Sequence, residues 1–200
     1  MLIQLLRTIP VSGSFKERHY NVSAGANAWV KFATEAGVEW VGVFGSGERS
    51  RFYQALPFGA DRGRTACIIA GGQGYVVDTE SGDQLRETPW RYGHAAIAVP
   101  DRDFVIVADD TEIWAAGRSG DRYAWRSEPA WYDYGVSDRP HRVALDGIIV
   151  DAATKDEVRG KIWEGDGWFE FRLLLPDLEL IRGWCLSEDW GAFDLRSPSV

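Results

Sequence analysis

Histidines and carboxylates are the residues of this 200-residue chain with the types that acid–base chemistry requires. The three histidines are His19, His94 and His141, and no two of them have the H-x-x-x-H spacing of a helical metal site. A pair drawn from His141, Asp109 and Asp133 would be suited to proton transfer if the fold brought it into a cleft. The sequence therefore leaves a small hydrolase or lyase open as one hypothesis.

The other motifs that could hold a ligand are better interpreted as turns. Four aspartates occur between residues 101 and 110, but the apolar stretch between them would separate the outer ones by about 20 Å as a strand, which disfavours calcium binding. Gly71–Gly74 lacks the G-K-S/T ending of a phosphate loop. Glu164–Gly167 lacks the ligand ladder of an EF-hand and is typical of a hairpin. We expect neither a metal nor a cofactor.

A third group of residues suggests binding rather than catalysis. The stretch 128–142 contains two prolines and polar turn residues, so we expect a loop. It also contains one tryptophan and two tyrosines, which are typical of hot spots in protein interfaces and uncommon in disordered segments. The alternative is that these rings cap an open end of the fold. The candidate partner-binding residues are Trp131, Tyr132, Asp133, Tyr134, Asp138, Arg139 and His141.

The overall charge narrows the partner class. The chain has 22 Lys plus Arg against 30 Asp plus Glu, a formal net charge of −8, and no cluster of basic residues. This composition disfavours nucleic acid and anionic membranes and suits a basic protein partner. No apolar run is long enough to span a membrane. The N-terminal stretch lacks a basic region before its short apolar segment, so we expect an opening strand and a cytoplasmic protein.

Strand patterns dominate the elements that must position these residues. Short β-branched and aromatic runs recur between Gly, Asp and Ser turns. One possible short helix covers 26–36, where apolar residues recur at three- and four-residue spacings. Cys67 lies in an apolar run and is expected in the core, and its pairing with Cys185 is left open. The predicted strands are Glu39–Phe44, Ala66–Ala70, Gly74–Asp78, Asp103–Ala108, Glu112–Ala116, Arg122–Arg126, Gly147–Val150, Val158–Trp163 and Trp168–Leu175.

Two of these segments repeat without a gap at an offset of 38 residues. Cys67–Ala70 aligns with Val105–Ala108, and the S-G-D turn at 81–83 aligns with the one at 119–121. A looser copy begins at Ile148–Val150, and a weaker one covers Val38–Leu56. The approximate units are 38–60, 64–90, 102–127 and 145–182 within a single domain, 1–200. A period near 40 with three or four strands a unit is the spacing of propeller blades, whose faces are buried by stacking.

The segment 70–83 resembles the blade repeat of quinoprotein-like (PQQ-type) propellers, in which a strand leads to an aspartate and a T/S-G turn. The unit at 113–125 is similar but lacks the aspartate. The chain has fewer units than those proteins, so their quinone site is not implied. The segment around 145–171 is also similar to small bacterial proteins with a few blade-like repeats, some of which resemble immunity proteins encoded beside toxins.

The sequence thus predicts an all-β fold, a short propeller-like array of three or four blades of antiparallel strands with a possible short N-terminal helix. The first functional hypothesis is a non-catalytic module that binds a protein, in concrete terms an immunity-type inhibitor that occludes a basic toxin domain. The resemblance implies a bacterial source for such a protein. A hydrolase or lyase, or a carbohydrate-binding module, remains the alternative.

Overall fold

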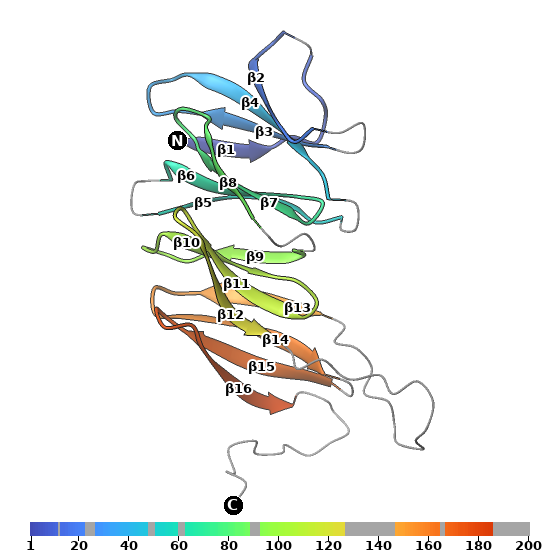
Figure 1. The fold of residues 1–200 in the computed structure, drawn as a ribbon, viewed down its shortest axis with the longest axis vertical. Coiled ribbons are helices and arrows are strands. Elements are labelled where there is room, and N and C mark those ends of the chain that lie inside the picture. The colour runs from blue at the N-terminus through green and yellow to red at the C-terminus, as the bar shows by residue number, and fades with distance from the viewer. Residues whose placement is uncertain are drawn as a thin grey trace, which may run out of the picture.

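The structure is a computed structural model that describes residues 1–11, 13–22, 27–47, 51–59, 63–88, 93–126, 147–164 and 167–185. Its elements are sixteen strands in four four-stranded sheets, stacked along the long axis of the molecule (Figure 1). The described residues include no helix, so the all-β prediction is confirmed. None of them forms a helix of the length and apolarity needed to cross a membrane.

Each sheet takes four consecutive strands of the chain. Sheets 2, 3 and 4 are antiparallel and keep their strands in sequence order. Sheet 1 has the order β1-β3-β4-β2, and its edge strand β2 runs parallel to β4. The strands of sheets 1 and 2 are β1 (Leu2–Leu5), β2 (Lys16–Tyr20), β3 (Asn27–Ala33), β4 (Glu39–Gly45), β5 (Tyr53–Phe58), β6 (Thr65–Ala70), β7 (Gln73–Asp78) and β8 (Gln84–Glu87). Those of sheets 3 and 4 are β9 (Ala95–Ala98), β10 (Phe104–Ala108), β11 (Glu112–Gly117), β12 (Asp121–Arg126), β13 (Ile148–Ala153), β14 (Glu157–Glu164), β15 (Gly167–Leu174) and β16 (Glu179–Cys185).

The predicted helix at 26–36 is wrong, because β3 occupies most of this stretch. Its burial alternates strictly, with Ala28, Val30 and Phe32 facing the core. The apolar residues that suggested a helical period also satisfy this period of two. Hydrogen-bonded pairing with β1 on one side and β4 on the other decides between the two patterns.

The 38-residue repeat corresponds to real structural equivalence in two sheets and not in the other two. β6 and β10 are the second strands of sheets 2 and 3, and β7 and β11 are the third strands. Ile148–Val150, however, belongs to the first strand of sheet 4, so its alignment with β6 and β10 is wrong by one strand. The expected unit 38–60 divides between two sheets, because β4 pairs with β3 while β5 pairs with β6.

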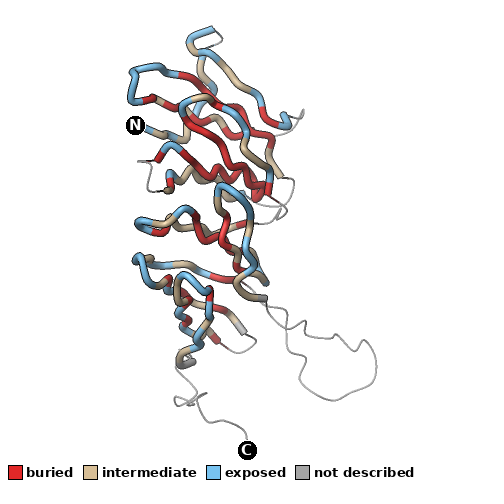
Figure 2. The backbone as a smooth tube through the Cα atoms, turned by 60° about the vertical axis from the view of Figure 1, so that its left-hand side comes forward, coloured by how far each residue is buried: buried red, intermediate tan, exposed pale blue. Residues whose placement is uncertain are grey.

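Three apolar clusters fill the spaces between successive sheets. Alternate residues of β6 serve two of them: Ile68 packs toward Phe44 of sheet 1, and Ile69 toward Val107 of sheet 3. Both faces of the central strands are therefore buried, as their uninterrupted apolar sequences predict (Figure 2). A third cluster, which includes Ile106 and Ile162, joins sheets 3 and 4.

The stack has two separate ends. The first strands β1, β5, β9 and β13 lie beside one another from sheet to sheet, while sheets 1 and 4 lie at opposite ends of the molecule (Figure 1). The last described strand, β16, pairs with β15 and not with β1. The described strands therefore form an open stack of sheets and do not form a closed ring.

Candidate functional site

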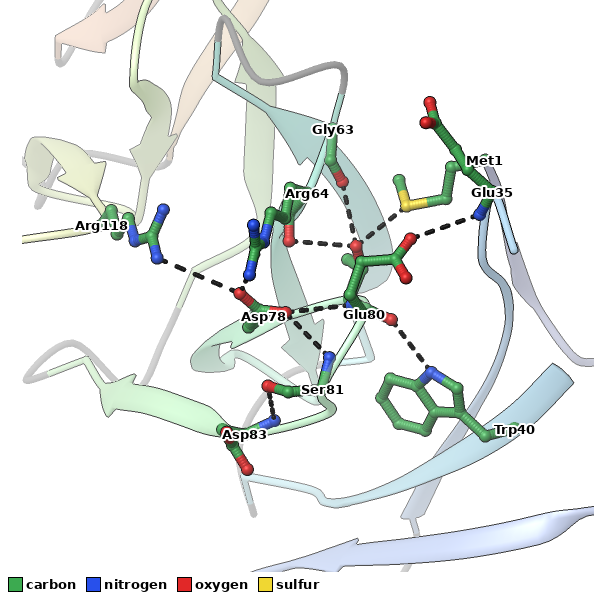
Figure 3. A network of polar contacts seen from close by, with 11 residues as sticks. Met1, Glu35, Trp40, Gly63, Arg64, Asp78, Glu80, Ser81, Asp83 and Arg118 are labelled. Carbon is green, nitrogen blue, oxygen red and sulfur yellow. Dashed lines mark hydrogen bonds and ion pairs between the residues drawn. The ribbon is translucent and has the colours of Figure 1, made fainter. Parts of the chain in front are cut away.

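The turn that follows β7 is the centre of a polar network between the first three sheets (Figure 3). One carboxylate oxygen of Asp78 accepts the backbone N–H groups of Glu80 (3.0 Å) and Ser81 (2.9 Å). The other lies 3.2 Å from Nε of Arg64 and 4.0 Å from a guanidinium nitrogen of Arg118, which lies in the turn between β11 and β12 of sheet 3. Both carboxylate oxygens of this aspartate therefore serve the turn and its neighbours.

These contacts set the ionisation of Asp78. Burial raises the pKa of the carboxyl, but the hydrogen bonds from the Ser81 backbone, the Arg64 side chain and the Glu80 backbone outweigh it and hold the pKa below its ordinary value of 3.8. The carboxylate is thus held charged, as a structural anion, rather than tuned toward neutral pH as a general acid would be.

Side chains of sheet 1 reach the same turn. Nε1 of Trp40 donates a hydrogen bond to the carbonyl oxygen of Thr79 (3.0 Å), and the hydroxyl of Tyr20 donates one to the carbonyl oxygen of Gly82 (2.6 Å). Burial raises the pKa of Tyr20 to about 12, so the hydroxyl remains a donor at neutral pH. The turn therefore joins sheets 1 and 2.

A second contact of the same kind joins sheets 2 and 3. Nε of Arg86, on β8, donates to the carbonyl oxygen of Gly117 (2.9 Å), and its two terminal nitrogens bind both carboxylate oxygens of Asp121. Only 17% of the arginine side chain and 7% of the aspartate side chain are exposed. Such a buried bidentate pair is costly to break from one side, because the remaining charge loses its partner.

At each of the three junctions between sheets, an arginine donates a hydrogen bond to a backbone carbonyl of the next sheet or of its turns. Arg18 on β2 donates to the carbonyl oxygen of Gly82 (3.3 Å), and Arg122 on β12 donates to that of Pro176 (3.1 Å). With Arg86 they form a series that we name the inter-sheet arginines: Arg18, Arg86 and Arg122. In each case the donor lies on the fourth strand of one sheet, and the acceptor lies before or in the turn that leads to the fourth strand of the next.

The sequence did not single out the inter-sheet arginines. Two of their acceptors, Gly82 and Asp121, lie in the S-G-D turns at 81–83 and 119–121, which are the repeated feature of the alignment. The arginines do not share one position in the 38-residue repeat. Their registers within their own sheets differ, and the long side chain of each spans the remaining distance to the next sheet. Each of these fourth strands contains at least one arginine, which is the signal that could have pointed to them.

The predicted partner-binding residues, Trp131, Tyr132, Asp133, Tyr134, Asp138, Arg139 and His141, lie outside the described residues. The ends of the connection that contains them are described. β12 ends at Arg126 in sheet 3, and Gly147 precedes β13 in sheet 4, where its carbonyl oxygen accepts the backbone N–H of Trp163 (3.1 Å). The connection therefore begins and ends on ordered, hydrogen-bonded strands of neighbouring sheets.

Asp109, the described member of the possible acid–base set, has a structural role. One of its carboxylate oxygens accepts the backbone N–H groups of Thr111 and Glu112, both at 2.7 Å, and so orders the turn between β10 and β11. The described residues contain no group of three or more potential metal ligands. Gly71 and Gly72 form the predicted tight turn between β6 and β7, both with positive φ. Cys67 is a free, wholly buried thiol.

The outer face of sheet 4 carries a different set of groups. Arg159 and Arg172 both bind the carboxylate of Glu157, with Nε of Arg172 at 2.8 Å. The hydrogen bond from Arg172, followed by that from Arg159, holds the pKa of Glu157 below its usual range. At the other end of β14 and β15, Trp163 and Trp168 make an edge-to-face pair with centroids 5.5 Å apart. This face displays cations and rings at one end of the stack.

Comparison with protein-family models and with curated proteins finds no match for this chain.

Proposed function

We propose that this protein is a non-catalytic protein-binding module, an immunity-type inhibitor that occludes a basic toxin domain. The observation that carries the proposal is the anchoring of the connection 127–146 on two neighbouring sheets of a stack held together by buried contacts. Binding residues commonly lie on loops that a rigid scaffold positions. This connection also has the composition of an interface hot spot.

The proposed mechanism is steric blockage assisted by charge. Trp131, Tyr132 and Tyr134 would serve as anchors that fill pockets of the partner, since aromatic side chains bury much area with few rotatable bonds. Asp133 and Asp138 would face lysine or arginine side chains. The net charge of −8 would steer a basic partner toward the protein and raise the association rate.

The scaffold itself we propose to be a short propeller-like array. Support comes from the stacking of four-stranded sheets through apolar faces and from the adjacent line of first strands β1, β5, β9 and β13. Sheets of this size cannot bury their faces alone and become stable by stacking on neighbours.

The test is calorimetric titration of the full chain against the basic protein encoded by the neighbouring gene, with growth rescue on co-expression as a second readout. We expect tight binding that weakens with added salt, and a loss of at least about tenfold in affinity for Trp131→Ala. Ile9→Ala is the matched control, because Ile9 is exposed at the other end of the stack. Absence of binding and of growth rescue would refute the proposal.

A further inference from the structure

The two ends of the stack differ in how their outer faces are covered. In sheet 1, Val41 and Val43 point away from sheet 2, yet they are 0% and 1% exposed. The connection between β1 and β2 lies on this outer side (Figure 1), and its Phe15 ring contacts Lys31 of β3. The N-terminal end is therefore closed by the chain's own residues.

Sheet 4 leaves apolar groups accessible on its outer face. Val158, Ile162 and Leu173 point inward to the cluster shared with sheet 3. By strand alternation Ile149 and Ile181 point outward, and they are 42% and 38% exposed. We name the outward-facing side chains of β13–β16 the terminal face.

The inter-sheet arginines give the stack a direction. Each reaches from one sheet to the turn before the fourth strand of the next. At sheet 4 the direction reverses, because Arg182 of β16 lies over the ring of Trp125 in sheet 3, 5.4 Å from its centroid. In sheet 1 the strand in the fourth position is β2, which follows the connection after β1 and not a turn from the third strand. Sheet 1 therefore does not have the turn that accepts the arginine in sheets 2 to 4. Two copies joined head to tail would therefore not continue the series.

The terminal face carries charges of both signs, which suits a copy of the same face. Lys161 and Glu170 are register partners, and Arg159 and Arg172 flank Glu157. With Glu179 and the exposed Asp151 of β13, the face carries three cations and four carboxylates. A two-fold axis in the plane of the contact lets the three cations of each copy meet carboxylates of the other copy.

We propose that the terminal face is the surface through which two copies of this chain pair about a two-fold axis, sheet 4 against sheet 4. Sheets 1 to 4 of one chain are already held together by face-to-face packing. The proposed contact repeats this packing between two chains. This inference is independent of the partner proposed above, since it uses none of the residues 127–146.

The dimensions predict a weak dimer. Four strands about 4.8 Å apart and seven residues long at about 3.3 Å each cover about 450 Å² on each copy. Burying about 900 Å² in total is at the low end for specific interfaces, which corresponds to dissociation in the micromolar range or weaker. Pairing is thus expected to depend on concentration.

The test is sedimentation equilibrium of the full chain from about 5 μM to about 500 μM, which spans the expected dissociation constant. We expect the average mass to rise from one chain to two. Ile181→Arg introduces a charge twice in each dimer and should raise the dissociation constant at least about tenfold. Val38→Arg is the matched control, because Val38 is exposed in the turn before β4 of sheet 1, and it should leave the constant unchanged.

Thermal melting shows whether each variant is folded, and Ile149→Lys replaces Ile181→Arg if the latter does not fold. A single-chain mass at every concentration would overturn the proposal, whether a different protein or residues 186–200 of the same chain occupy the face. A dimer whose dissociation constant is unchanged in Ile181→Arg and in Ile149→Lys would overturn it as well.

Discussion

At the scale of single residues, the pair Arg86–Asp121 is the contact whose loss should cost most. Arg86→Met leaves the Asp121 carboxylate buried without its partner, and we expect the free energy of unfolding to fall by about 3 kcal/mol. Urea denaturation followed by tryptophan fluorescence measures it. Glu39→Gln removes the more exposed pair with Lys31 and should cost less than about 1 kcal/mol. Equal losses in the two variants would contradict this role for Arg86.

Asp78 predicts a specific dependence of stability on pH. Because its pKa is lowered in the folded protein, its ionised form stabilises the fold fully above about pH 3.8, and this contribution is lost as the pH falls through the lower folded value. Asp78→Asn should therefore be less stable at pH 7 and lose less stability on acidification. Stability measured between pH 7 and pH 3 tests this.

Asp177→Asn is the control for the Asp78 variant, because it makes the same change at an exposed position. Its stability should follow that of the unaltered protein through the acid range. If the stability of Asp78→Asn showed the same dependence on pH as that of the unaltered protein, the Asp78 carboxylate would not be the structural anion described above.

At the scale of elements, the close approach of the β6–β7 hairpin to the connection after β4 can be tested at one glycine. Gly71 has φ +55°, and a Cβ there would lie 1.9 Å from Oγ of Ser46 and 2.7 Å from the carbonyl oxygen of Gly47. We expect Gly71→Ala to destabilise the protein by about 2 kcal/mol, since both the backbone and the contact resist it. Thermal or urea unfolding measures the loss.

Gly120→Ala is the matched change in the turn between β11 and β12. A Cβ at Gly120 would meet no atom within 4 Å, and its backbone is not in the left-handed region. This variant should stay within about 0.5 kcal/mol of the parent. A large loss there, or none at Gly71, would argue against the arrangement of these two turns.

The strands themselves were largely predictable, and the reasons for the failures are physical. All nine predicted strands correspond to strands in the structure, because buried β-branched runs between turn residues allow few alternatives. β3 was predicted as a helix because the spacing of its apolar residues fits both a helical period and the strand period of two. Only its pairing with β1 and β4 decides between the two structures. β9 was left out of the repeat units, and β5, which is less completely buried than β6, was placed in the unit 38–60 instead of in the unit of its partner β6. The candidate binding residues remain a prediction from composition.

At the scale of the whole molecule, the open stack follows from contacts that no local pattern reveals. The sequence indicated stacking through the apolar runs of β6 and β10, whose two faces needed covering. It left open whether the chain closes on itself, because closure depends on the two end sheets. In the structure these ends differ: sheet 1 has an internally covered outer face, and sheet 4 exposes Ile149 and Ile181.

The open stack is the central claim, and the distance between its end sheets tests it most directly. Spin labels at Val38→Cys and Glu179→Cys, both exposed sites, can be introduced with Cys185→Ser while Cys67 stays wholly buried. Labelled chains diluted with unlabelled ones report only distances within one chain. Three spacings of about 10 Å between sheets predict a separation of about 30 Å or more by double electron–electron resonance. A separation of about 10–20 Å, as in a ring with sheet 4 packed on sheet 1, would contradict the account.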